Sequence, residues 1–178
     1  MAFTITSPAF EPNGEIPARY TCEGENVSPP LNWNGVPAGT RSLVLVVEDP
    51  DAPDPAAPRM IWVHWMLYNI PATTTGLAEA IRSDSLPEGA REAFSDWMRP
   101  GYDGPCPPIG RHRYIFRLLA LDIVLPEIHR PKRDTVDRAM SGHVLGTAEL
   151  TGTYKKRSRC RPAPRMPNAG EQRIMSVR

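Results

Sequence analysis

The sequence Ser42-Leu43-Val44-Leu45-Val46-Val47-Glu48 decides the fold class, because five apolar residues, three of them β-branched, follow one another without a polar interruption. Such a run is typical of a strand buried on both faces of a sheet. Met60 to Ile70 and Arg113 to Asp122 have a similar composition, and proline-containing stretches separate the three segments. We therefore expect three long strands at the centre of the domain. Shorter strands are predicted at Phe3–Thr6, Leu31–Trp33 and Glu149–Tyr154.

Proline accounts for 21 of the 178 residues, about twice its usual share of ~5%. Because proline breaks helices and cannot donate to a strand ladder, this abundance favours short strands joined by stiff loops. Helical signals are weak. Asp134 is predicted to cap a helix from Thr135 to Met140 with Gly142 as its stop, and Glu88 to Met98 is predicted to hold a helical turn or two. The sequence predicts a mainly β protein, a β-sandwich of antiparallel sheets with Greek-key-like connections and one or two short helices.

Length and composition indicate one domain without a membrane anchor. A chain of 178 residues is long enough for one substantial core, and no apolar run approaches the ~20 residues of a membrane helix. The segment Met1 to Pro8 lacks the pattern of a signal peptide. Cys22, Cys106 and Cys160 are odd in number and far apart, which predicts neither a disulfide framework nor a zinc knuckle. Since free thiols suit a reducing compartment, the sequence predicts a cytoplasmic protein.

Charge is distributed unevenly along the chain. Residues 1–154 carry 13 Lys/Arg and 19 Asp/Glu, a net charge of −6, whereas residues 155–178 carry 8 and 1, a net charge of +7. We expect an ordered domain over residues 1–156 and a basic, disordered tail over residues 157–178. The alternative is a tail that contacts nucleic acid or anionic lipid. No aromatic residues alternate with the basic ones, so a specific nucleic-acid partner is not expected.

Two candidate polar residues lie in the first half of the chain. Asp49 follows the buried strand directly, and the prolines of Asp49-Pro50-Asp51-Ala52-Pro53 would fix its carboxylate at the sheet edge, although an aspartate before proline also starts ordinary turns. His64 lies in the second strand, where alternation predicts that it shares a face with Trp62 and Met66. It is either a hydrogen-bonded core residue or an imidazole at a pocket floor, with a readily tuned charge.

The segment Gly104-Pro105-Cys106-Pro107-Pro108-Ile109-Gly110-Arg111-His112-Arg113-Tyr114 is the most specific signal. Its glycines permit close backbone approach, its prolines make the loop stiff, and its N–H groups can form an anion-binding concavity. His112 and Tyr114 share one strand face, and Arg113 points the other way. The alternative is an irregular loop that leads into a strand.

Together with Asn26-Val27-Ser28-Pro29-Pro30-Leu31-Asn32-Trp33 and Gly142-His143-Val144-Leu145, these segments resemble the phosphatidylethanolamine-binding protein family, in particular its bacterial Raf-kinase-inhibitor-like branch. The resemblance covers about residues 5 to 156 and implies a β-sandwich whose pocket binds phosphate-like anions. It also implies a homodimer, and Cys106 stands where eukaryotic members have a second proline. The tail does not resemble their C-terminal helix. The implied ligand-binding residues are Asp49, Ala52, Pro53, His64, Gly104, Pro105, Cys106, His112 and Tyr114.

The function expected is that of a non-enzymatic binding protein with a small pocket for phosphate or a phosphoryl group such as a phospholipid headgroup. Cationic His64 and His112 would hold the oxyanion, Tyr114 and the Gly104 amide would donate to it, and Asp49 would orient an imidazole. Affinity should then fall as pH rises through about 6.5, the reference pKa of histidine.

Two alternative functions use the same residues. The family resemblance allows a regulator that docks a protein kinase or protease at the pocket mouth. A hydrolase would use the histidines for acid–base chemistry, but the sequence lacks Gly-x-Ser-x-Gly and His-Glu-x-x-His motifs. We predict no catalytic residue, no metal and no cofactor, since the spacing of two histidines and one aspartate is not diagnostic of a metal site.

Overall fold

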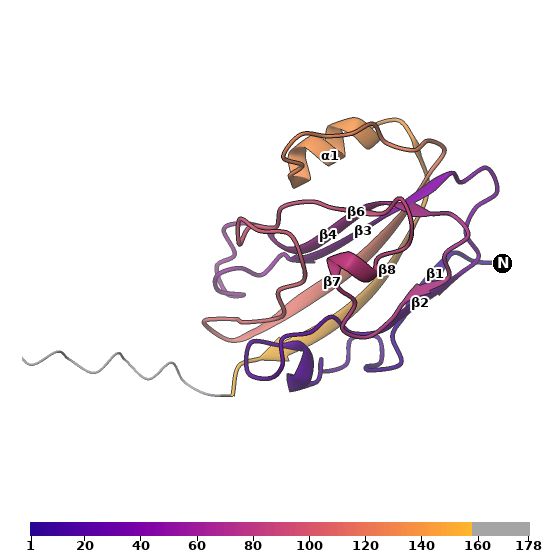
Figure 1. Ribbon diagram of the computed structural model, residues 1–178. Helices are drawn as coiled ribbons and strands as arrows, with labels where there is room; N and C mark the ends of the chain where they lie inside the picture. The colour runs from indigo at the N-terminus through magenta and orange to yellow at the C-terminus, as the bar shows by residue number, and fades with distance from the viewer. Residues whose placement is uncertain (158–178) are drawn as a thin grey trace, which may run out of the picture.

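The computed structural model describes residues 1–157 and consists of two antiparallel sheets and one α-helix (Figure 1). The strand order is β1-β2-β5 in the small sheet and β6-β4-β3-β7-β8 in the large one, which confirms the predicted mainly β fold. The elements are β1 (Thr4–Thr6), β2 (Leu31–Asn34), β3 (Ser42–Asp49), β4 (Trp62–Pro71), β5 (Gly76–Leu77), β6 (Arg91–Glu92), β7 (Arg111–Leu121), α1 (Arg133–Met140), β8 (Val144–Lys155) and 3₁₀ turns at Ala18–Tyr20 and Ser83–Ser85.

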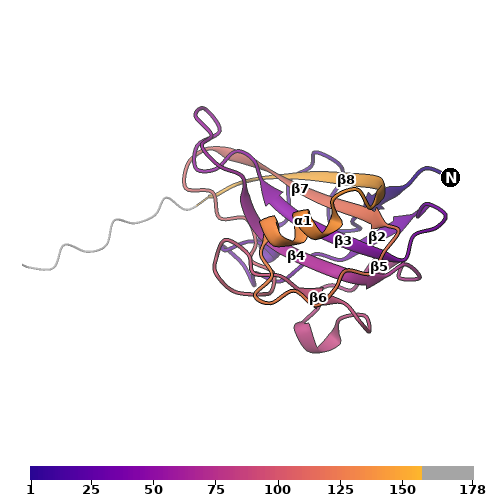
Figure 2. The ribbon, with the colours of Figure 1, turned by 90° about the horizontal axis from the view of Figure 1, so that it is seen from above.

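The apolar run predicted as a buried strand is β3, the central strand of the large sheet, and all eight of its residues are buried. Its side chains alternate between two cores. Leu43, Leu45 and Val47 pack between the two sheets, and Val44 and Val46 pack on the opposite face. Helix α1 covers that second face (Figures 1 and 2). Because α1 and the small sheet cover both faces, the large sheet can be apolar on both sides.

A buried ion cluster ties α1 to the large sheet. The Glu48 carboxylate is 2% exposed and accepts hydrogen bonds from Arg117 Nη1 at 2.6 Å and from Arg133 Nη1. Burial of a carboxylate is tolerated when charged donors satisfy it. The helix was predicted to follow a cap at Asp134, but it begins at Arg133, and the Lys132 N–H donates to Thr135 Oγ1 across its first turn.

Two sequence predictions of local structure were wrong. Residues 88–98 do not form helical turns, because the Ala93 N–H pairs with the Met66 carbonyl and the Phe94 N–H with that of Pro131, which commits the backbone to neighbouring segments. Strand β8 begins at Val144 rather than Glu149, because it pairs with β7 along nearly its whole length. Exposed residues at the start of a strand give no alternating pattern from which pairing can be predicted.

The prediction about cysteines was also wrong, since Cys22 and Cys106 form a disulfide with a Cα–Cα distance of 5.4 Å. They are 84 residues apart in sequence, and the Cys22 N–H donates to the Pro105 carbonyl at 3.1 Å, which brings the two segments together. Cys160 and most of the predicted tail lie outside the described residues. Arg157 is described, and its N–H donates to Glu23 Oε2 at 2.8 Å.

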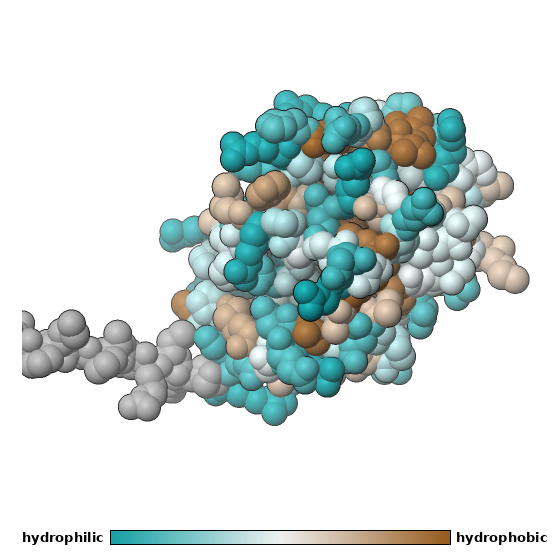
Figure 3. Space-filling view, in the orientation of Figure 1, coloured by the Kyte–Doolittle hydropathy of each residue, from teal (hydrophilic) through white to brown (hydrophobic). Residues whose placement is uncertain are grey.

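On the face shown in Figure 3, hydrophobic residues lie in small groups separated by hydrophilic ones, as expected where most large apolar side chains are buried. Within residues 1–157, no helix is long and apolar enough to cross a membrane.

Candidate functional site

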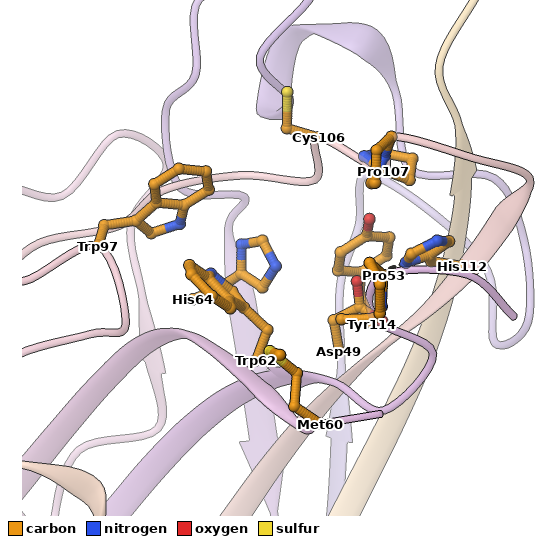
Figure 4. A pocket seen from close by; sticks show the side chains of 12 residues that line it. Asp49, Pro53, Met60, Trp62, His64, Trp97, Cys106, Pro107, His112 and Tyr114 are labelled. Carbon is orange, nitrogen blue, oxygen red and sulfur yellow. Dashed lines mark hydrogen bonds and ion pairs between the residues drawn. The ribbon is translucent and has the colours of Figure 1, made fainter. Parts of the chain in front are cut away.

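A cavity of about 350 Å³ opens at the end of the large sheet where β3 ends and β4 and β7 begin (Figure 4). Seven of the nine predicted site residues line it, and Gly104 and Pro105 do not. Five residues that were not predicted complete the lining. The full set is Asp49, Ala52, Pro53, Met60, Trp62, His64, Trp97, Cys106, Pro107, Pro108, His112 and Tyr114.

Asp49 and His112 form a buried pair at one side of the cavity. His112 is fully buried, its Nδ1 lies 2.7 Å from Asp49 Oδ2, and its Nε2 lies 2.9 Å from the Ile109 carbonyl oxygen. Asp49 Oδ1 accepts from the Asp51 N–H at 2.8 Å. A carbonyl oxygen only accepts hydrogen bonds, so Nε2–H donates to Ile109. The remaining proton lies between Nδ1 and the carboxylate, and the pair is electrically neutral overall.

This geometry changes the role that the sequence suggested for His112. Asp49 orients an imidazole, as expected, but both ring nitrogens of His112 are already engaged. The ring therefore has no N–H left to donate to an anion in the cavity. His112 and Tyr114 do share a strand face with their rings stacked at 6.5 Å, so the His112 ring contributes a rigid wall.

His64 lies at an irregularity of β4. Val47 pairs with Trp65 and Glu48 pairs with Val63, so His64 is an extra residue between two registers. An extra residue of this kind bends the strand and changes where its side chain points. The prediction that His64 shares a face with Met66 was wrong, because Met66 packs in the core on the α1 side, whereas His64 joins Trp62 at the cavity.

The hydrogen bonds of His64 leave one ring nitrogen for a ligand. His64 Nδ1 lies 2.6 Å from the Asp103 carbonyl oxygen, so it carries the proton and donates. No hydrogen bond within residues 1–157 occupies Nε2. The side chain is 3% exposed, and burial lowers the pKa of His64 below its usual value. In the free protein at neutral pH the ring is neutral, and Nε2 is an acceptor.

The segment that carries Gly104 supports His64 instead of facing the cavity. The Asp103 carboxylate accepts from Arg99 Nε at 2.9 Å and from Asn26 Nδ2 at 3.3 Å. The Gly104 N–H donates to Asn26 Oδ1 at 2.8 Å, so this amide is not available to a ligand. A Cβ at Gly104 would lie 2.0 Å from the Tyr20 carbonyl oxygen, which explains the need for glycine by close packing.

The cavity contains two unsatisfied polar groups. Within residues 1–157, the buried side-chain nitrogen and oxygen atoms that make no hydrogen bond are Tyr114 Oη and Trp62 Nε1, and both residues line this cavity. Burial first, and the charge of Asp49 second, raise the pKa of Tyr114, so its hydroxyl keeps its proton. Since buried polar groups in proteins are nearly always paired with protein groups or water, two such donors in one cavity indicate that water or a ligand completes them.

No lysine or arginine is among the lining residues. Arg113 points away from the cavity, as predicted, and its Nη2 donates to Asp51 Oδ1 at 2.7 Å. This contact lowers the pKa of the Asp51 carboxyl group. Among the described residues, no group of three histidine, cysteine, aspartate or glutamate side chains is arranged to hold a metal ion.

A family model described as phosphatidylethanolamine-binding protein matches residues 6–155. The chain belongs to the phosphatidylethanolamine-binding protein family. A UPF0098 protein of Methanothermobacter thermautotrophicus is 49% identical over 153 residues, which cover 85% of this chain and 98% of that protein. Such membership marks the chain as a binding protein.

Solved structures of family members have the same fold. A Chlamydia trachomatis homologue of the phosphatidylethanolamine-binding protein is 40% identical, with a TM-score of 0.79 and coverage of 87% of this chain and 98% of that one. Escherichia coli YbcL, described as a member of the mammalian family, is 34% identical, with a TM-score of 0.78 and coverage of 88% and 99%.

The lining residues that the sequence did not predict are mostly apolar. Strand alternation predicted that Trp62 shares a face with His64, but Trp62 was not among the predicted ligand-binding residues. Met60 precedes the strand, and Trp97 lies on an irregular loop after β6; no periodic pattern marks either. Pro107 and Pro108 follow Cys106 directly and were interpreted only as stiffening residues.

Proposed function

We propose that the protein is a non-enzymatic binding protein whose cavity holds phosphate or the phosphoryl group of a larger ligand. The observation that carries this proposal is the pair of orphan buried groups, Tyr114 Oη and Trp62 Nε1, in one cavity. An anion with several acceptor oxygens satisfies such donors better than a ligand with one acceptor, and hydrogen bonds to an anion are stronger than those between neutral groups.

The cavity is suited to an anion that shares a proton with the protein. The Asp49–His112 pair is neutral, no arginine or lysine lines the cavity, and His64 Nε2 is an acceptor in the free protein. An oxygen of a bound phosphate dianion would face the lone pair of His64 Nε2, and these two acceptors would repel each other. Binding therefore requires one proton between His64 and the ligand, carried in by the phosphate monoanion or taken up by the ring.

The pH dependence of binding tests this proposal. A phosphate monoester loses its second proton with a pKa of about 6, and inorganic phosphate loses it at a somewhat higher pH. Above that pH the complex contains one proton more than its separated components, so affinity should fall about tenfold per pH unit. The sequence predicted the same direction, but through two cationic histidines; here only His64 takes part.

The experiment is a calorimetric titration of inorganic phosphate from pH 6 to 8.5. His64→Gln is the matched variant, because an amide can donate to Asp103 or to the ligand without titrating near neutral pH. We expect the wild type to lose affinity as pH rises and the variant to lack that decrease. An affinity of the wild type that is constant over this range would contradict the shared proton, and no binding at any pH would contradict the phosphate site.

Other sequence predictions remain proposals. Docking of a protein kinase or protease at the cavity mouth, a homodimer, and the absence of catalytic activity stay predictions. A location in the cytoplasm also remains a prediction. It was based in part on free cysteines, and the Cys22–Cys106 disulfide contradicts that part, since disulfides persist mainly in oxidising compartments. Trapping of free thiols in intact cells would test the location of the protein through the redox state of this pair.

A further inference from the structure

The cavity is larger than one phosphoryl group requires. Its volume of about 350 Å³ lies in the range of roughly 300–1,000 Å³ that encloses organic ligands of drug-like size. The groups suited to the anion, His64 and Tyr114, lie together, with ring centroids 5.3 Å apart. The rest of the lining is mostly apolar, so the space beyond the anion site is suited to an apolar part of the same ligand.

Two walls bound this additional space (Figure 4). Trp97, Trp62 and Met60 lie on one side, and Pro53 and Pro107 on the other. The indole rings of Trp62 and Trp97 meet edge to face, with centroids 5.4 Å apart and planes at 74°. Proline rings are rigid and stack well on flat groups, so the region between the walls is a slot that loses little entropy when it is filled.

The wall formed by Trp97, Trp62 and Met60, here called the indole wall, is incompletely packed, as the exposure of its side chains indicates. Trp97 is 43% exposed and Met60 is 50% exposed, although both are large apolar side chains that contribute most when buried. The Trp97 ring contacts the rings of Trp62 and His64, and the ring centroids of Trp97 and His64 lie 6.4 Å apart. The side chain is therefore held at the cavity with part of its apolar surface unused.

The slot favours a flat apolar group over a cation. A quaternary ammonium is held best by several aromatic faces that surround it, whereas Pro53 and Pro107 form part of the wall opposite the indoles. The one carboxylate in the lining, Asp49, is engaged by His112 and by the Asp51 N–H. A ligand cation would thus have no unpaired anion at the cavity to neutralise it.

We propose that the cavity selects phosphomonoesters with an aromatic ring, which would lie between the Trp62–Trp97 wall and the prolines while the phosphoryl group contacts Tyr114, His64 and the Nε1–H of Trp62. This inference rests on the proposed function and adds the class of ligand. Stacking of a flat ring on an aromatic side chain increases affinity by about tenfold to a hundredfold. Phenyl phosphate should exceed inorganic phosphate by that factor.

The test measures the dissociation constants of inorganic phosphate, phenyl phosphate and phosphocholine by calorimetry at pH 6.5. The proteins are the wild type, Trp97→Ala and Met98→Ala. Met98 is the matched control, because it follows Trp97 on the same loop and is 65% exposed, but does not line the cavity. We expect Trp97→Ala to reduce the preference for phenyl phosphate over phosphate at least fivefold, and Met98→Ala to preserve it.

Each other outcome has a distinct meaning. Equal affinity of the wild type for phosphate and phenyl phosphate would overturn the aromatic selection and leave the phosphate site in place. A preference for phosphocholine that Trp97→Ala removes would also overturn it, in favour of a cation at the indole wall. Failure of both phosphate and phenyl phosphate to bind would overturn the proposed function itself.

Discussion

Replacement of Tyr114 by phenylalanine should stabilise the free protein and weaken ligand binding. The buried Tyr114 hydroxyl makes no hydrogen bond of normal geometry to the described residues, and an unpaired buried polar group costs about 1–3 kcal/mol. We expect Tyr114→Phe to raise the free energy of unfolding by about 1 kcal/mol, or about 2–4 °C in Tm for a domain of this size. A hydrogen bond to a charged group contributes about 1.5–3 kcal/mol, so phosphate affinity should fall at least about tenfold.

The assay combines urea denaturation in phosphate-free buffer with calorimetric titration of phosphate. Tyr154→Phe is the control, because the Tyr154 hydroxyl is also buried but donates to Glu23 Oε2 at 2.5 Å. Loss of that donor should destabilise the protein by about 1–3 kcal/mol without a change in phosphate affinity. The reasoning is refuted if Tyr114→Phe destabilises the protein as Tyr154→Phe does, or if it binds phosphate as tightly as the wild type.

Three further predictions concern the supports of the cavity. Because folding lowers the pKa of His64, the unfolded chain binds more protons than the folded protein below about pH 6.5. The free energy of unfolding should therefore fall as pH decreases from 6.5 to 5. The urea midpoint of His64→Gln should decrease less over this range than that of the wild type. Reduction of the Cys22–Cys106 disulfide, which closes a loop across a separation of 84 residues, should lower the free energy of unfolding by about 4 kcal/mol. Urea denaturation with and without a reductant measures this difference, and a difference below about 1 kcal/mol would contradict the prediction. Asp49→Asn removes the charged partner of buried His112 and should destabilise the protein by about 3 kcal/mol, and unchanged thermal unfolding would argue against the pair.

The sequence predicted the central strands because burial on both faces leaves a continuous apolar run. The run from Ser42 to Glu48 became β3 with every residue buried. The alternation of His112, Arg113 and Tyr114 also held, with Arg113 directed away from the cavity to Asp51. These features depend on contacts that repeat along a strand, and a repeating contact leaves a pattern in the sequence.

Features that depend on single long-range contacts were not predictable in this way. The irregular register at His64 arises from how Val47 and Glu48 pair across the sheet, and nothing in the sequence around His64 marks it. The Cys22–Cys106 disulfide joins two loops that the fold brings together. Gly104 was predicted as an anion donor, but its N–H pairs with Asn26, 78 residues away.

A crystal structure of the protein with saturating phosphate tests the central claim most directly. We predict phosphate in the cavity, with its oxygens within hydrogen-bond distance of Tyr114 Oη, Trp62 Nε1 and His64 Nε2. His112 should still be bound to Asp49 and the Ile109 carbonyl. Phosphate held elsewhere by surface arginines, with both Tyr114 Oη and His64 Nε2 without a ligand, would contradict the account.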